Sequence, residues 1–128
     1  MANADLDIDT IFNSTLEALL WSTPDLQTGD PLDADYGPDD VTAEVKAELR
    51  EEIEEFVSEN GDDLRAALTS GTGYTQGHIG HDIALTRNHH GAGFWDRGLG
   101  SVGTRLTDAA HNLGSLDLYP TTDGTVRA

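Results

Sequence analysis

Cysteine is absent from the 128 residues, and this absence removes several kinds of chemistry at once. Without thiols the chain has no disulfide framework, no thiolate nucleophile and no cysteine-ligated zinc site. Long apolar runs are also missing, since none approaches the roughly 20 residues that a membrane span needs. The first seven residues carry acids where a secretory signal would carry positive charge. These absences predict a soluble, intracellular protein.

Positive charge is scarce, because seven Lys and Arg against 24 Asp and Glu give a net charge of −17. Residues 1–63 hold 19 acids against only Lys46 and Arg50, whereas residues 64–128 hold five acids and five arginines. Adaptation to a salt-rich cytoplasm would make both halves acidic, and solubility alone needs a net charge of only about 2 to 8. The uneven distribution leaves two interpretations open, an acidic surface with a function and an acidic side that serves only solvation. The lack of a basic patch disfavours direct binding of nucleic acid.

Helical periodicity dominates the acidic half. A first helix is predicted from Asp9 or Thr10 to about Trp21, where Pro24 ends the pattern. Residues 22–38 are rich in Pro, Gly, Asp and Thr and predict a loop. A second helix is predicted from Asp39 or Asp40 to the pair at 60–61, followed by a short third helix over 62–68.

The second predicted helix carries an unusual density of acids. Its apolar positions form one stripe at three- and four-residue steps, while a set of glutamates forms a separate stripe with the same spacing. Nine acids over the 39–60 segment come at about one per 3.7 Å, close to the ~3.4 Å per phosphate along one DNA strand. Like charges four residues apart destabilise a helix, so helix stability does not account for the pattern. The residues predicted to bind a partner are Asp40, Glu44, Glu48, Glu51 and Glu55.

The neutral half is rich in glycine and predicts short strands. Residues 81–87 and 92–97 are predicted as two strands around a turn at 88–91, followed by a helix over 104–111. Residues 116–119 and 125–127 flank a second turn. The predicted fold class is α+β, with N-terminal acidic helices packed on a small antiparallel β-β-α-β-β unit. A single domain over 1–128 is expected, with an acidic helical part at 1–68 and a glycine-rich mixed part at 69–128.

All five histidines lie between 78 and 111, beside two aspartates. His78, His81 and His90 are alternative metal ligands, since imidazole suits zinc, iron or nickel, although their spacing matches no zincin-type motif. Because neighbouring residues on a strand point to opposite faces, the predicted strand would separate His81 from Asp82. Another interpretation is that the histidine side chains bond to the backbone in tight turns, with no role in metal binding or catalysis. No cofactor is expected, because the glycines near 91–93 lack a nucleotide-binding pattern. The alternative catalytic set is His81, Asp82, His90 and Asp96.

The stretch from His81 to Gly98, HDIALTRNHHGAGFWDRG, strongly resembles a family of small, largely uncharacterised phage proteins. The family pattern is approximately H-D-F-W-L-T-R-N-G-H-G-A-G-F-W-D-R-G. The likeness extends to residues 18–23, 31–33, 36, 105–110, 116–119 and 123–124. Here Ile83 and Ala84 replace an aromatic pair, which suggests a lost or altered contact. His89 replaces the turn glycine, so its backbone need not be left-handed.

The resemblance implies a viral origin and action in the cytoplasm of an infected bacterium, but no reaction. The leading hypothesis is a non-enzymatic phage accessory protein that binds a host or phage protein with a basic surface. An acidic, phosphate-mimicking face would inhibit a nucleic-acid-handling protein, for example one of host defence. The alternatives are a small metal-binding protein or hydrolase that uses the His/Asp cluster, and a component of the virion.

Overall fold

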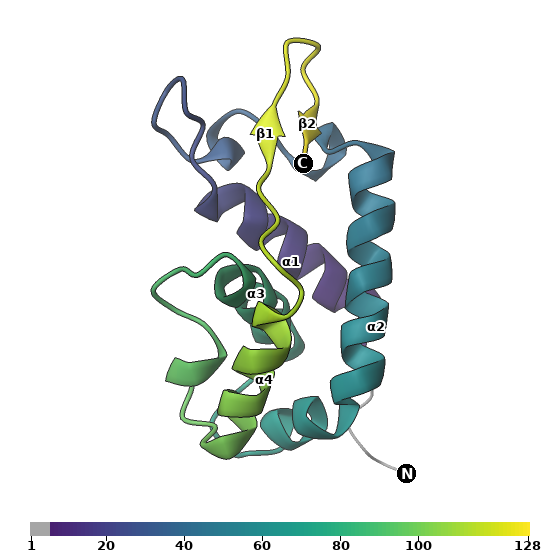
Figure 1. The fold of residues 1–128 in the computed structure, drawn as a ribbon, viewed down its shortest axis with the longest axis vertical. Coiled ribbons are helices and arrows are strands. Elements are labelled where there is room, and N and C mark those ends of the chain that lie inside the picture. The colour runs from purple at the N-terminus through teal and green to yellow at the C-terminus, as the bar shows by residue number, and fades with distance from the viewer. Residues whose placement is uncertain (1–5) are drawn as a thin grey trace.

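The computed structural model describes residues 6–128, and four helices make up most of the fold (Figure 1). Helix α1 (Ile8–Ser22) begins at Asp7, whose side chain accepts a hydrogen bond from the Thr10 N–H. It ends just before Pro24, so the predicted first helix is confirmed. Short 3₁₀ turns η1 (Leu32–Ala34) and η2 (Pro38–Asp40) follow.

Helix α2 (Ala43–Leu68) joins two segments that the sequence predicts as separate helices. Asn60 has non-helical dihedral angles (φ −118°, ψ 20°) and kinks the helix, while its side-chain amide donates to the Phe56 carbonyl. The N-terminal cap is Thr42, whose hydroxyl accepts from the Val45 N–H. The expected start at Asp39 or Asp40 was therefore early, because both aspartates lie in η2.

The predicted strand over 81–87 is wrong, since these residues form the second half of helix α3 (Gln76–Arg87). Thr75 caps this helix: its hydroxyl accepts from the His78 N–H, and the imidazole Nδ1 of His78 accepts from the Thr75 N–H. Residues 79–80 and 82–87 are all buried, polar residues included, so α3 shows no amphipathic period. Its glycines and its lack of periodicity concealed the helix.

The predicted β-β-α-β-β unit is also wrong. The expected returning strand over 92–97 is a 3₁₀ turn, η3 (Phe94–Asp96), and helix α4 (Ser101–His111) follows it. Strands β1 (Tyr119–Pro120) and β2 (Val126–Arg127) form a small antiparallel hairpin, which confirms only the last predicted turn. The protein is mostly helical.

Helices α1 and α3 pack closely, and glycine makes this approach possible. A Cβ added at Gly80 would lie 2.6 Å from the Ile11 carbonyl oxygen and 2.7 Å from the Thr15 nitrogen, both backbone atoms of α1. The central core lies between these helices and α2, with Leu19, Phe56 and Ile83 fully or almost fully buried. No helix in the described part of the chain has the length and apolar character to cross a membrane.

His89 has a left-handed backbone (φ 59°), contrary to the sequence-based expectation. It follows the α3 C-terminus, where the His89 N–H donates to the Thr86 carbonyl and the His90 N–H donates to the Leu85 carbonyl. This pair of hydrogen bonds is the Schellman motif, which favours glycine at the left-handed position. His89 therefore adopts a left-handed conformation that glycine would adopt more easily.

Replacing His89 with glycine is expected to raise the free energy of unfolding by about 1 kcal/mol, because glycine adopts this conformation without steric cost. The gain is partly offset by loss of the stacking between the His89 and His111 rings, whose centroids are 4.6 Å apart. Urea denaturation of His89→Gly and His89→Ala separates the two effects, since only alanine loses the ring and keeps the strain. A glycine variant no more stable than the alanine variant contradicts this account.

Candidate functional site

Four exposed glutamates line one side of α2, and we refer to them as the carboxylate stripe: Glu44, Glu48, Glu51 and Glu55. Their steps of four, three and four residues place them on one helix face, ahead of the kink at Asn60. Among residues 6–128, no cation forms an ion pair with any of them. The stripe is a continuous row of uncompensated carboxylates along about 16 Å of helix.

The six arginines form ion pairs elsewhere. Three of these pairs connect distant elements at 2.8 Å or less: Arg50 bonds to Asp9 at 2.6 Å, and both Arg87–Glu52 and Arg105–Asp63 are 2.8 Å long. The hydrogen bond from Arg105 lowers the pKa of the Asp63 carboxyl. The remaining pairs are Arg50–Glu54, Arg65–Asp62, Arg97–Asp82 and Arg127–Asp123. The arginines therefore neutralise acids outside the stripe.

Asp40 differs from the four glutamates. It belongs to η2 rather than α2, and its carboxylate accepts a hydrogen bond from the Gly37 N–H at 2.8 Å. Asp40 is half-buried, whereas the stripe residues are exposed. Its side chain thus has a local structural role, and the stripe is described without it.

A hollow of about 160 Å³ lies beside the first turns of α2. Glu44 and Glu48 line one wall, and Leu116 and Tyr119 line the other. Arg127 also reaches this hollow, but its guanidinium pairs with Asp123 at 3.5 Å. The chain segment that leads into β1 therefore borders the stripe.

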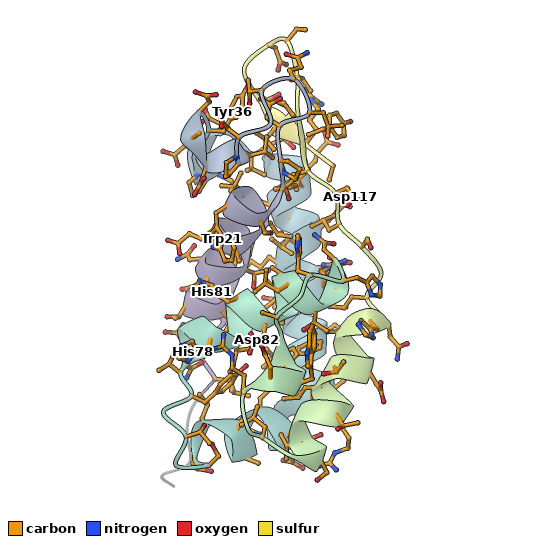
Figure 2. The ribbon with its side chains drawn as sticks, turned by 90° about the vertical axis from the view of Figure 1, so that its left-hand side faces the viewer. Trp21, Tyr36, His78, His81, Asp82 and Asp117 are labelled. Atoms are coloured by element: carbon orange, nitrogen blue, oxygen red, sulfur yellow. The ribbon has the colours of Figure 1, made fainter. Side chains whose placement is uncertain are left out.

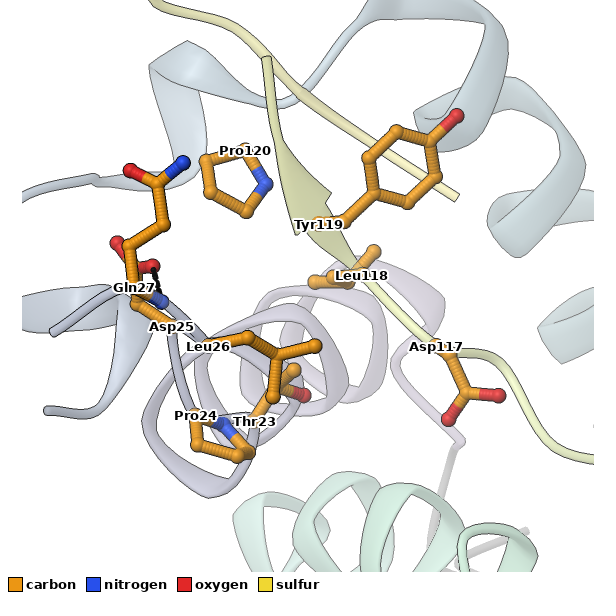
Figure 3. A pocket seen from close by; sticks show the side chains of 9 residues that line it. All are labelled: Thr23, Pro24, Asp25, Leu26, Gln27, Asp117, Leu118, Tyr119 and Pro120. Atoms are coloured by element: carbon orange, nitrogen blue, oxygen red, sulfur yellow. Dashed lines mark hydrogen bonds between the residues drawn. The ribbon is translucent and has the colours of Figure 1, made fainter. Parts of the chain in front are cut away.

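An apolar groove of about 460 Å³ lies on the other side of that segment (Figure 3). Its walls are the loop after α1 and the segment around β1, and we refer to it as the 23–27/117–120 groove. Leu26 lies across from Leu118, and Pro24 and Pro120 add apolar surface. Tyr119 lines both the groove and the glutamate-lined hollow. Tyr119 therefore connects the groove to the hollow that Glu44 and Glu48 line.

Asp82, an alternative catalytic residue, is fully buried and fully engaged. The Tyr74 hydroxyl donates to its carboxylate at 2.6 Å, and Arg97 donates through Nε and Nη2 at 3.0 to 3.2 Å. Burial, with the Asp82 charge adding to it, raises the pKa of the Tyr74 phenol far above its usual range. The hydrogen bonds to Asp82 raise the pKa of Arg97. This cluster joins α3 to the loop after η3 and leaves Asp82 no exposed oxygen for proton transfer.

The structure does not gather the other alternative residues around Asp82. His81 packs edge-on against Trp21 at a centroid distance of 6.2 Å, and His78 lies against Tyr74 at 5.5 Å. Figure 2 shows Trp21, His81 and His78 in succession along one side of the molecule.

Asp96 and His90 lie beyond the α3 C-terminus. The Asp96 carboxylate accepts from the Gly93 N–H at 3.1 Å, and His90 lies in the turn after α3. Within the described 6–128 range, no three His, Asp or Glu side chains form a group that could hold a metal ion. The geometry therefore gives no support to the hydrolase or metal-binding alternatives.

Two residues of the 81–98 stretch, Arg87 and Asn88, connect α3 to distant segments of the chain. We refer to their hydrogen bonds together as the clasp, and the sequence did not predict it. Arg87 is 1% exposed and donates to both carboxylate oxygens of Glu52, at 2.8 and 3.1 Å, and to the carbonyls of Gly114 and Leu113. Asn88 donates to the Leu116 carbonyl and accepts from the Leu116 N–H. The sequence feature that could have indicated these bonds is the run of polar residues over 86–90, within the 81–98 stretch.

Two more motif positions have structural roles. The Thr86 hydroxyl accepts from the Phe94 N–H at 3.3 Å, and a Cβ at Gly93 would collide with that hydroxyl and with the Trp95 ring. Ile83 and Ala84, which replace the aromatic pair of the phage pattern, are fully buried. The side chains at these two positions therefore contribute to core packing rather than to an exposed contact.

No protein-family model, curated protein or solved structure matches this chain. The resemblance to the phage family therefore stays a prediction, and the functional argument rests on the surface described above.

Proposed function

We propose that this protein is a non-enzymatic phage accessory protein that binds a protein partner in the bacterial cytoplasm through the carboxylate stripe. The partner has a basic surface that normally holds nucleic acid, and occupation of that surface blocks the nucleic acid. The observation that carries the proposal is that all six arginines pair with other acids, while no ion pair to the stripe forms within residues 6–128. A basic partner would supply the missing positive charge.

The charge density of α2 supports phosphate mimicry. Seven glutamates lie between Glu44 and Glu59, along about 22 Å of helix. That is one charge about every 3.8 Å, near the ~3.4 Å per phosphate of a DNA strand. Glu52 and Glu54 pair with arginines, so the uncompensated charges are sparser than phosphates. Helix α2 therefore resembles a DNA strand in its linear charge density, although individual carboxylates do not match individual phosphates in position.

A displacement experiment tests the proposal. Bacterial lysate is loaded on DNA–cellulose at low salt, and the purified protein is expected to release a bound DNA-binding protein. The Glu48→Gln/Glu51→Gln variant removes the middle of the stripe and should need about tenfold more protein for half-maximal release, since close charge pairs across an interface contribute about 1.5 kcal/mol or more.

The matched control is Glu17→Gln/Asp108→Asn, which removes the same charge from exposed positions on α1 and α4. This control should release the DNA-binding protein as the unchanged protein does. Equal loss in both variants would show that only net charge matters. Failure of the unchanged protein to release any DNA-binding protein would overturn the proposal.

A further inference from the structure

The 23–27/117–120 groove is a largely apolar hollow of about 460 Å³, and its walls come from segments about ninety residues apart. Its floor is Leu118, which is 4% exposed, and its rim carries Leu26, which is 93% exposed. Figure 3 shows Leu26 extending from the loop toward Leu118. An apolar hollow bordered by an exposed aliphatic side chain offers surface that another molecule can bury.

Hydrogen bonds fix the loop that carries Leu26. The buried Asp25 carboxylate accepts from the Gln27 N–H at 2.9 Å, and the Gly29 N–H donates to the Asp25 carbonyl at 2.7 Å. The Leu32 N–H donates to the Thr23 carbonyl at 2.9 Å and closes the base of the loop. A wall fixed in this way loses little conformational entropy when a ligand binds.

The groove continues into the surface that carries the stripe. Tyr119, half exposed, lines the groove and also the hollow beside Glu44 and Glu48. Asp25 and Asp117 line the groove, whereas no lysine or arginine in the described part of the chain does so. A cationic segment that crosses the stripe would thus meet an apolar hollow with negative charge at its edge.

We propose that the groove binds an apolar side chain carried by a basic segment of the partner. The inference rests on the proposed function and names the partner's recognition element: arginines or lysines against the stripe, and a leucine-like side chain between Leu26 and Leu118. A second copy of this chain fits less well, because its net charge of −17 repels an identical surface. Apolar contact then supplies the specificity that charge alone lacks.

Two synthetic peptides test this arrangement by fluorescence anisotropy. Both carry two arginines at each end, and the central residue is leucine in one and serine in the other. The leucine peptide is expected to bind the unchanged protein at least about tenfold more tightly, because a buried leucine contributes about 1.5 kcal/mol or more. Leu26→Ser should make the two affinities equal without unfolding the protein, since this side chain is exposed.

The stripe variant separates this inference from the proposed function. Glu48→Gln/Glu51→Gln should weaken both peptides by the same factor and keep the preference for leucine. Equal binding of the two peptides to the unchanged protein would refute the binding of an apolar side chain in the groove, while the proposed role of the stripe would still stand. A leucine preference that survives Leu26→Ser would also overturn the binding in the groove. Sedimentation that shows a dimer broken by Leu26→Ser would assign the groove to a second copy and refute the inference.

Discussion

Replacing Arg87 with methionine is expected to lower the free energy of unfolding by about 2 to 4 kcal/mol. The Arg87 guanidinium is buried and holds Glu52 of α2 together with the carbonyls of Gly114 and Leu113 after α4. Removing the buried arginine leaves the half-buried Glu52 carboxylate and the two carbonyls without this donor, and the loss of these hydrogen bonds dominates the energy. Because a domain's whole stability is about 5 to 15 kcal/mol, this change removes a large part of it. Urea denaturation followed by circular dichroism measures the change.

The double variant Arg87→Met/Glu52→Leu provides the control. It removes both charges, so no carboxylate is left beside an apolar side chain, and we expect at least about 1 kcal/mol of the loss to be recovered. A single variant that costs less than about 1 kcal/mol would show that the clasp does not hold α2, α3 and the segment after α4 together.

Reversal of the carboxylate stripe has the largest expected effect on binding. Changing Glu44, Glu48, Glu51 and Glu55 to lysine should weaken binding to the partner by at least about a hundredfold, because attraction becomes repulsion at each position. The fold should persist, since the four side chains are exposed and form no ion pair within residues 6–128. The affinity for the released DNA-binding protein is measured by calorimetry.

Changing the same four residues to glutamine is the matched control for that reversal. It removes the like-charge pairs along α2, each of which costs about 0.2 to 0.5 kcal/mol, and should therefore raise the stability of the protein. Its affinity should fall between those of the unchanged and reversed proteins. A reversed variant that binds as tightly as the unchanged protein contradicts the role of the stripe.

The sequence predicted those elements whose faces differ in polarity. Helix α1 shows an apolar period between an aspartate cap and Pro24, and α4 shows one with Gly114 at its end. Both helices were therefore predicted to within a few residues. The kink in α2 at Asn60 was also predicted in part, because the sequence indicated a boundary between two helices at residues 60–61.

Helix α3 could not be predicted from its pattern, because it is buried on nearly every side. Gly80 lowers its intrinsic helix propensity, yet the close contact with α1 requires glycine there. Asp82 and Arg87 lie in the core with partners from distant segments, and no local pattern reveals such partners. The predicted β unit failed for this reason.

The candidate site was predictable only in part. Periodicity alone placed Glu44, Glu48, Glu51 and Glu55 on one face, but the pairing of the arginines elsewhere depends on tertiary contacts such as Arg105–Asp63. The groove combines residues from both ends of the chain, so the sequence carried no sign of it. Asp40 has the charge and spacing that the sequence suggests for a site residue, but its carboxylate instead accepts a hydrogen bond from the nearby backbone.

The salt dependence of partner binding tests the central claim most directly. The affinity of the unchanged protein and of the four-glutamine variant is measured from about 50 mM to about 500 mM NaCl by calorimetry. If the stripe binds a basic surface, the unchanged protein should lose affinity steeply with salt and the glutamine variant much less steeply, because screening weakens only charge pairs that exist. Affinity that is independent of salt, or equal slopes for the two proteins, would contradict the account.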